Sequence, residues 1–426
     1  MRTAARNILL SINIWMIIFP GLLALLGLFR FFLHPSRSGI YYYTPYLFFF
    51  QWPVTLLLIV LLIMALILLI RHTKFDFQSL LSYTYLLFLI AIVLMLLSTA
   101  KNGLTSAALI GEGEKHESLF TYLAYFLLFF LVCSFIESPT IKKWMANIFL
   151  GASFFVSLYS ICFSSVWYQY MDLMGFFNNS NEFGYYLSIT VMLAASMYVI
   201  CQNRIGRILY LLLFSFQASV LMYNNTLGAW VGIVFGFLLL ILVSFLCPNI
   251  SRSRSVIAFA VFIFVTLITI PLGSKMFASF LGIFSDVNLI ASGAVDAAEA
   301  GNGRWKIWRA TVSYIGERPW LGFGVEGISE RLHEDAGNYR PHNEFLQYAV
   351  FFGIPFAISY VLGIVSIYIR ALRVRDRLDP MTCVCLIVAF SYLGSAFFGN
   401  TYYYTAPNFF IFLGLGYRNF IPRRSF

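Results

Sequence analysis

The chain has 426 residues, of which 60% are hydrophobic, 19% aromatic and only 11% charged. Soluble domains contain about 45–50% apolar and about 25% charged residues, so this composition excludes a soluble enzyme. The mean hydropathy of +0.82 extends over the whole length, which leaves most of the chain without a polar face for water. The composition therefore predicts a protein that is solvated by a lipid bilayer.

Twelve apolar runs are long enough to cross a bilayer, for which about 17 to 25 residues are needed. They predict an all-α polytopic membrane protein with about 12 transmembrane helices. Arg2 and Arg6 precede the first run, as in a signal peptide, but its length and the lack of a clear cleavage site favour a first membrane helix. The runs lie at residues 8–28, 47–70, 80–98, 119–136, 147–166, 183–200, 207–223, 229–247, 256–272, 346–369, 381–398 and 407–421.

Basic residues gather in the predicted connections on one side of the membrane. These connections and the two termini hold 17 of the 28 basic residues but only 4 of the 18 acidic ones. Such an excess predicts that this side is cytoplasmic, with both termini inside. It also accounts for the net charge of +10 without nucleic acid as a partner. The basic residues concerned are Arg2, Arg6, Arg71, Lys74, Lys142, Lys143, Arg204, Arg207, Arg252, Arg254, Arg370, Arg373, Arg375, Arg377, Arg418, Arg423 and Arg424.

Residues 273–345 form the one long connection between apolar runs, and they fall on the extracytoplasmic side. The predicted organisation is transmembrane helices 1–9 in residues 1–272, the large loop in residues 273–345 and transmembrane helices 10–12 in residues 346–426. Within the loop, Asn302–Tyr314 combines tryptophans with arginines and a lysine, which is typical of an amphipathic helix at a membrane interface. A loop of this length in a compact bundle is usually functional.

A histidine follows a proline where the large loop re-enters the membrane, in Arg340-Pro341-His342-Asn343-Glu344. Pro341 suits the start of a helix, which predicts that His342 lies in the first helical turn at the boundary between water and lipid. The positive end of a helix favours the neutral imidazole, which acts as a base near neutral pH. The alternative is an interfacial histidine that only reaches toward water.

Arginines alternate with tryptophans in Gly303-Arg304-Trp305-Lys306-Ile307-Trp308-Arg309. In a dry outer cavity, guanidinium groups suit a diphosphate because they stay charged and match the phosphate oxygens. The alternative is a surface helix that is anchored to lipid headgroups. The later segment Gly322–Gly327 has the glycine spacing of a dinucleotide-binding loop, but no strand precedes it, so a turn is predicted instead.

Two polar segments rich in asparagine interrupt the apolar runs. The first, Phe176–Gly184, contains Asn181 at an outer membrane boundary, and its amides suit either helix capping or the binding of sugar hydroxyls. The second, Tyr223–Trp230, contains Asn225 and is too short for a loop of its own. Such a break is typical of backbone that lines a cavity at membrane depth.

Several chemistries have no support in the sequence. It lacks a P-loop, an H-E-x-x-H motif, a G-x-S-x-G motif and any Cys/His spacing for a metal, so no metal or other cofactor is predicted. The six cysteines lie in or at the ends of apolar runs, which predicts no disulfide framework. No acidic residue lies deep in the apolar runs, where a proton-coupled transporter needs one.

In order and content, these segments resemble the O-antigen ligase and polymerase family of bacterial envelope glycosyltransferases. The resemblance runs from about residue 175 to about residue 365. It is carried by the Asn-rich turn that ends at Gly184, the break at 224–230, Arg304 with Trp308, Glu317–Gly324 and Pro341–Gln347. The last two segments are the most specific.

The resemblance implies a GT-C-like enzyme on the outer face of the bacterial cytoplasmic membrane. It implies an undecaprenyl-diphosphate-linked glycan as donor, a glycan or lipid-linked acceptor, and inversion at the anomeric centre without a metal. His342 would remove the proton from the acceptor hydroxyl, and Arg304 would hold the departing diphosphate, so both are predicted catalytic residues. The predicted substrate-binding residues are Arg340, Arg309, Asn343, Asn181 and Asn225.

The chain departs from the ligase pattern at one position. Many members carry an arginine just after a Ser or Thr in the second polar segment, where this chain has Leu227 after Thr226. Arg340 and Arg309 are the candidates to replace that charge. The Leu227-Gly228 pair resembles members from polymer-making systems, so it favours a polymerase over a ligase.

Two other functions share some of these features. A multi-pass flippase or secondary transporter of a lipid-linked or envelope solute often has 12 helices, but it predicts ionisable groups near mid-membrane or inverted repeats, and the sequence shows neither. A peptidoglycan polymerase would use a similar donor lipid and would be expected to show an essential aspartate in the outer loop. Asp286, Asp296 and Asp335 lie in contexts that do not resemble that family.

Overall fold

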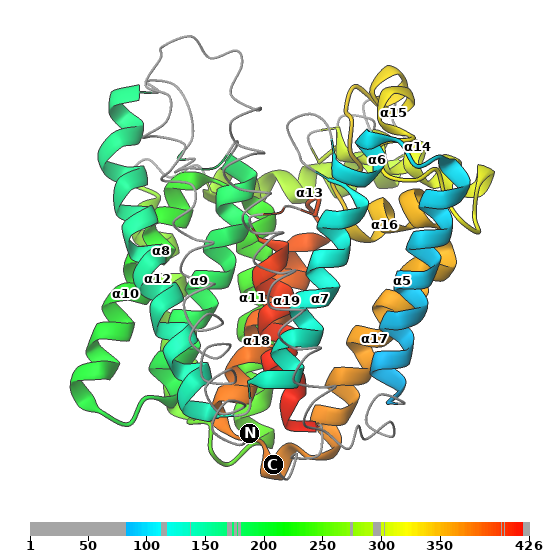
Figure 1. The fold of residues 1–426 in the computed structure, drawn as a ribbon. Helices are drawn as coiled ribbons and strands as arrows, with labels where there is room; N and C mark the ends of the chain where they lie inside the picture. The colour runs from blue at the N-terminus through cyan, green and yellow to red at the C-terminus, as the bar shows by residue number, and fades with distance from the viewer. Residues whose placement is uncertain are drawn as a thin grey trace, which may run out of the picture.

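The computed structural model describes residues 82–111, 117–136, 138–167, 173, 177, 180–272, 276–292, 300–301, 303–401, 403 and 405–420. Every regular element within these residues is a helix (Figure 1). Ten of the predicted apolar runs fall in this part of the chain, and each coincides with helix. The first two runs, at 8–28 and 47–70, lie outside the described residues.

In the described part of the chain, ten helices form a bundle, and five further helices gather at one of its ends, which we call the loop end (Figure 1). The bundle helices are α5 (Tyr83–Asn102), α7 (Leu119–Phe135), α8 (Pro139–Trp167), α9 (Ser180–Ile200), α10 (Arg204–Asn224), α11 (Leu227–Leu246), α12 (Arg252–Thr269), α17 (Ile354–Arg373), α18 (Pro380–Ala396) and α19 (Ala406–Tyr417). The helices at the loop end are α6 (Ser106–Ile110), α13 (Met276–Ser292), α14 (Arg304–Glu317), α15 (Ser329–Ala336) and α16 (Glu344–Phe352). Two short 3-10 helices are η3 (Arg375–Arg377) and η4 (Arg418–Phe420).

Seven helices in the described residues are long and apolar enough to cross a membrane: α5, residues Pro139–Cys162 of α8, α9, α10, α11, α12 and α17. Helices α7, α18 and α19 are apolar but shorter. The structure therefore supports a polytopic helical membrane protein. The count of 12 spans stays a prediction.

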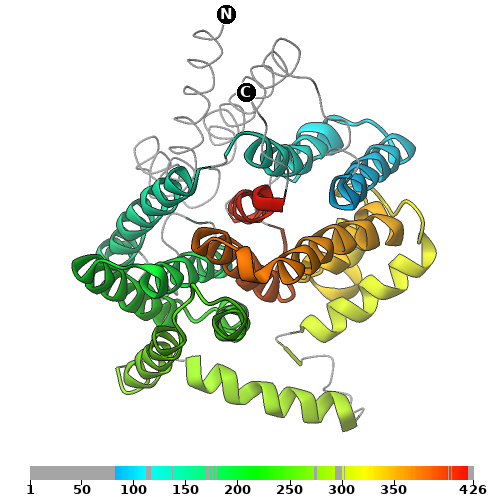
Figure 2. The same cartoon turned by 90° about the horizontal axis from the view of Figure 1, so that it is seen from below.

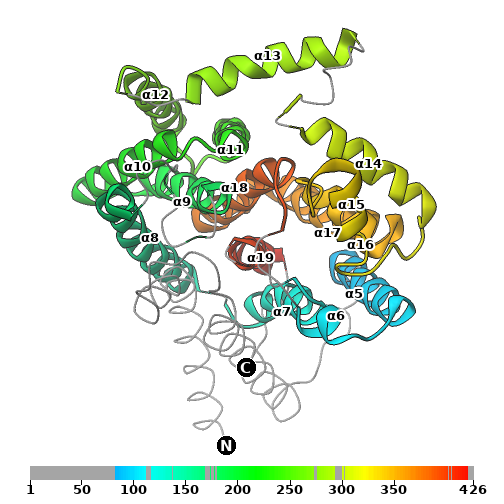
Figure 3. The same ribbon diagram turned by 90° about the horizontal axis from the view of Figure 1, so that it is seen from above.

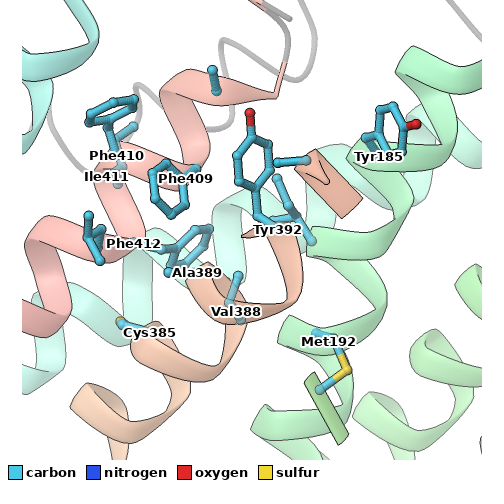
Figure 4. Packing of buried hydrophobic residues seen from close by; sticks show 14 of the residues in the cluster. Tyr185, Met192, Cys385, Val388, Ala389, Tyr392, Phe409, Phe410, Ile411 and Phe412 are labelled. Carbon is cyan, nitrogen blue, oxygen red and sulfur yellow. The ribbon is translucent and has the colours of Figure 1, made fainter. Parts of the chain in front are cut away.

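The core of the bundle lies around α9, α18 and α19, which the views along the bundle axis place at its centre (Figures 2 and 3). Helix α9 is buried on all sides from Glu182 to Val199, as expected of a helix whose whole circumference is apolar. Tyr392 of α18 stacks on Phe409 of α19 with their ring centroids 4.7 Å apart (Figure 4). Small residues allow α11 to approach α18 closely, because a Cβ on Gly232 would lie 2.1 Å from Ser395 Oγ.

Successive bundle helices alternate in direction, so their connections fall at two opposite ends (Figure 1). The connections between α7 and α8, α9 and α10, α11 and α12, and α17 and α18 share the end opposite the loop end. Basic residues that the sequence assigns to the cytoplasmic side lie in these connections or in the helical turns beside them, among them Lys142, Arg204, Arg252 and Arg375. The structure brings these charges to one end of the bundle, and their cytoplasmic orientation stays a prediction.

The predicted run 346–369 is not one continuous helix. Helix α16 ends at Phe352 and α17 begins at Ile354, because Gly353 between them has a left-handed φ of 94°. A Cβ on Gly353 would lie 2.2 Å from the carbonyl oxygen of Trp320, so only glycine fits. The break lets the backbone N–H of Ile354 donate to Pro319 O at 2.8 Å, which ties the large loop to the top of α17.

Candidate functional site

The glycine-rich segment after α14 forms a turn, as the sequence predicts, and it packs against the end of α16. The N–H groups of Phe323 and Gly324 donate to Val350 O and Phe351 O at 2.9 and 2.8 Å. These carbonyls belong to the last turn of α16, where partners within the helix are lacking. The turn therefore holds α16 in place at the loop end.

Helix α14 carries Arg304 in its first turn. Gly303 precedes it in a left-handed conformation, with φ 77°, and begins the helix without a side-chain cap. Gly301 N–H donates to Asp286 Oδ2 of α13 at 3.0 Å, which fixes the start of α14 to α13. The Arg304 side chain is half-buried. Arg304 therefore lies at the loop end in a position that is partly removed from water.

Arg309 is exposed and lies on another side of the same helix. Five residues along an α-helix correspond to a rotation of about 140°, so Arg304 and Arg309 do not share a face. Trp308, four residues after Arg304, does share its face. The Trp308 ring packs against Phe397 and Phe398, with centroids 5.7 and 6.3 Å apart.

His342 precedes α16 instead of lying in its first turn, which corrects the predicted helix start at Pro341. Helix α16 begins at Glu344 with Asn343 as its N-cap, and His342 has a left-handed φ of 51°. Histidine is among the residues that tolerate this conformation better than most. The His342 side chain is half-buried, and its backbone N–H donates to Asn400 Oδ1 at 2.7 Å. The loop histidine is therefore held by the segment that joins α18 to α19.

Asn343 and Glu344 both have structural partners. The Asn343 side chain is buried and accepts a hydrogen bond from Leu346 N at 3.0 Å, so it caps α16. Glu344 is fully buried and accepts hydrogen bonds from Tyr360 at 3.0 Å and Tyr392 at 2.7 Å. Burial raises the pKa of the Glu344 carboxyl to about 7. The sequence analysis did not single out Glu344, although it lies within the predicted motif.

Arg340 lies in a buried network of carboxylates and not at an open surface. Its Nε donates to Glu117 Oε2 at 2.6 Å, and its Nη2 pairs with Glu326. Its Nη1 donates to Ser329 Oγ and to Tyr339 O. The neighbouring negative charges raise the pKa of Arg340 further, against the effect of burial. These contacts fasten the segment before α15 and the segment before α16 to the start of α7.

The two asparagine-rich segments meet at the loop end. Asn224 ends α10, and its Nδ2 donates to Ser180 O, at the start of α9, at 2.9 Å. Asn225 follows with a left-handed φ of 60° and caps α10, while Asn181 lies half-buried in the first turn of α9. The second segment is therefore a tight turn between α10 and α11, fixed to the first segment through Ser180.

The structure adds one segment that the sequence analysis missed. The α18–α19 connection, described at residues 397–401, 403 and 405, contacts α9, α14, α16 and the segment of His342. Phe398 O accepts a hydrogen bond from Tyr185 at 2.7 Å, and Thr401 N donates to Gln347 Oε1 of α16 at 3.2 Å. Its signal in the sequence is the polar break Gly399-Asn400-Thr401 between two apolar runs, the same signal that marks Asn224.

Helix α14, which carries Arg304, and the segment that carries His342 therefore contact the same connection: Trp308 packs on Phe397 and Phe398, and the His342 N–H donates to Asn400. Arg340, Arg309 and Asn343 lie on the same end of the bundle, but Arg340 is occupied by carboxylates, Arg309 is exposed and Asn343 caps a helix. No three His, Cys, Asp or Glu side chains in the described part of the chain are placed to hold a metal ion.

Comparison with known proteins finds one family whose model matches part of the chain. Residues 209–361 match the family described as O-Antigen ligase. The matched region includes α11 to α16, Arg304 and His342. A search of curated proteins finds no match to the chain. The family match confirms the resemblance of this helical membrane protein to the O-antigen ligase and polymerase family.

Proposed function

We propose that the protein is an inverting, metal-independent glycosyltransferase of the outer face of the bacterial cytoplasmic membrane. It transfers glycan from an undecaprenyl-diphosphate-linked donor to the hydroxyl group of an acceptor. The observation that carries the proposal is that the helix of Arg304 and the segment of His342 both contact the α18–α19 connection, while both residues lie in the region that matches the O-antigen ligase family.

His342 acts as the general base in this proposal. It takes the proton of the acceptor hydroxyl while the hydroxyl oxygen forms a bond to the anomeric carbon. The bond from that carbon to the diphosphate oxygen breaks, and its electron pair leaves with the diphosphate. A single displacement of this kind inverts the anomeric centre. The diphosphate is already an activated leaving group, so a base, a positive charge and the exclusion of water are sufficient.

Arg304 stabilises the negative charge that develops on the departing diphosphate. Its half-buried position suits this role, because a guanidinium that is partly removed from water attracts phosphate more strongly. Arg340 holds the loop through Glu117 and Glu326, so we do not assign it to the diphosphate. Arg309 is exposed and serves at most the entry of the anionic substrate.

A polymerase and a ligase share this chemistry and differ in the acceptor. A polymerase joins two lipid-linked glycans, whereas a ligase transfers the glycan to a different lipid. Leu227 favours the polymerase. The experiment is to incubate the purified protein with an undecaprenyl-diphosphate oligosaccharide alone and to separate the glycans on a gel. A ladder that depends on His342 supports a polymerase, whereas product only after addition of a second lipid acceptor supports a ligase.

A further inference from the structure

Asn400 has one satisfied and one unsatisfied side-chain atom. The residue is 2% exposed, and its Oδ1 accepts the backbone N–H of His342. Its Nδ2 has no hydrogen-bond partner among the described residues. A buried amide donor that is left unpaired loses its hydrogen bond to water without compensation, so such groups call for an explanation. The Nδ2 donor requires an acceptor oxygen that the described residues do not supply.

The bond to Asn400 holds a strained backbone. His342 has a φ of 51°, and a non-glycine residue keeps this unfavourable conformation only where its surroundings enforce it. Asn400 supplies one enforcing contact at the residue from which the imidazole projects. The same carboxamide therefore fixes His342 with its oxygen and offers a donor with its nitrogen.

The position of Asn400 is itself fixed from both sides. The carbonyl of Phe398, two residues before Asn400, accepts a hydrogen bond from Tyr185, and the N–H of Thr401, the next residue, donates to Gln347. Gly399 lies so close to the Tyr185 ring that a Cβ would be 2.4 Å from it. The Asn400 carboxamide is therefore held in a rigid setting, as a group that orients a substrate must be.

A second unpartnered donor lies against the same connection. Trp308 Nε1 is buried and has no hydrogen-bond partner among the residues described, and the Trp308 ring packs on Phe397 and Phe398. Trp308 lies one helical turn after Arg304, and Asn400 contacts His342. Asn400 Nδ2 thus lies near His342, and Trp308 Nε1 lies near Arg304. Neither donor has an acceptor among the described residues. A glycan, with its many hydroxyl and ring oxygens, supplies the complementary acceptors.

We propose that Asn400 binds the acceptor hydroxyl of the glycan through Nδ2 while it positions His342 through Oδ1, and that Trp308 donates to a second glycan oxygen. This inference rests on the proposed function. The hydroxyl oxygen accepts a hydrogen bond from Asn400, and the hydroxyl proton goes to His342. The hydrogen bond from Asn400 and the hydrogen bond to His342 together orient the hydroxyl oxygen for attack. The proposed transfer needs no further reactant.

Asn400→Asp separates the two roles of the side chain. It retains an oxygen that accepts the His342 N–H and replaces the Nδ2 donor by an oxygen. With undecaprenyl-diphosphate oligosaccharide as the probe, we expect kcat/KM to fall about tenfold or more, since at least one substrate hydrogen bond is lost. We also expect the acid limb of the pH–rate profile to move to higher pH, because a carboxylate beside an imidazole favours its protonated form.

Two comparisons make the result specific. Asn203→Asp introduces the same charge at the N-cap of α10, at the opposite end of the bundle, and should leave both kcat/KM and the profile unchanged. Trp308→Phe keeps the packing ring and removes the N–H, so it should lower kcat/KM without changing the profile. Thermal unfolding in detergent should have the wild-type midpoint in Asn203→Asp and Trp308→Phe. A buried carboxylate lowers the midpoint of Asn400→Asp, so all rates are compared per amount of folded protein.

Wild-type values of kcat/KM and of the acid limb in Asn400→Asp would overturn the inference. A loss of activity that only follows a loss of folded protein would overturn it as well. Neither result contradicts the proposed function if the wild type transfers glycan and this activity depends on His342. An inactive wild type would instead contradict the proposed function, and this inference with it.

Discussion

Arg340 and Glu117 form a buried ion pair, with Nε and Oε2 2.6 Å apart, that joins the end of the large loop to the start of α7. Both side chains are 3% exposed. Removing one partner of a buried pair leaves an uncompensated charge, which costs about 3–5 kcal/mol. The ion pair therefore holds the segment before α16 against the start of α7, and the placement of the neighbouring His342 depends on it.

Arg340→Met should destabilise the protein by about 3–5 kcal/mol, measured as a lower midpoint of thermal unfolding in detergent. The matched control is Arg331→Met, because Arg331 pairs with Glu317 at 3.1 Å with both side chains about half-exposed. Water screens an exposed pair, so this control should differ little from wild type. Adding Glu117→Gln to Arg340→Met should restore part of the loss. Equal midpoints for the Arg340 and Arg331 variants would contradict the fastening role.

Gly353→Ala should destabilise the junction between α16 and α17. Gly353 has a φ of 94°, and a Cβ there would lie 2.2 Å from Trp320 O. Backbone strain and this overlap together should cost at least about 2 kcal/mol. Gly316→Ala is the control, since nothing lies within 4 Å of a Cβ at this position in α14. The control should be neutral or stabilising by up to about 1 kcal/mol, and similar midpoints for both variants would refute the steric argument.

Because of Glu344, we expect the free energy of unfolding to fall as the pH rises. Burial raises the pKa of its carboxyl to about 7, from an ordinary value of 4.5, so between these values the folded chain binds more protons than the unfolded chain. Its contribution is therefore complete below pH ~4.5 and is lost as the pH rises through about 7, by about 3 kcal/mol in all. Glu344→Gln stays neutral and keeps the shape of the side chain. Unfolding midpoints at pH 5.5 and 8 should differ more in the wild type than in Glu344→Gln, and an equal difference would contradict the raised pKa.

Arg304→Lys keeps the positive charge and loses the planar fork of donors. We expect transfer to fall by about tenfold or more, because two parallel hydrogen bonds to the diphosphate become one. Arg373→Lys, at the opposite end of α17 from the loop end, is the matched control and should retain activity. Full activity of Arg304→Lys would favour a helix that is only anchored to lipid headgroups.

The sequence predicts the helices well and their contacts poorly. The apolar runs coincide with helices because burial in lipid or in the core requires them, and Arg304 and His342 are marked by local motifs. The partners of these residues are not local. Glu117 is 223 positions from Arg340, and Asn400 is 58 positions from His342, so no spacing rule points to them. The start of α16 was also missed, because a left-handed residue after Pro341 stops the helix from beginning there.

The central claim is that His342 removes a proton during transfer from a diphosphate lipid. The most direct measurement is the release of undecaprenyl diphosphate from the lipid-linked oligosaccharide by the purified wild type, by His342→Ala and by His342→Asn. Asparagine tolerates the left-handed backbone at this position, so the second variant removes the base without adding strain. We predict release by the wild type and a loss of at least about a hundredfold in both folded variants. Release at the wild-type rate by His342→Asn would contradict the assignment.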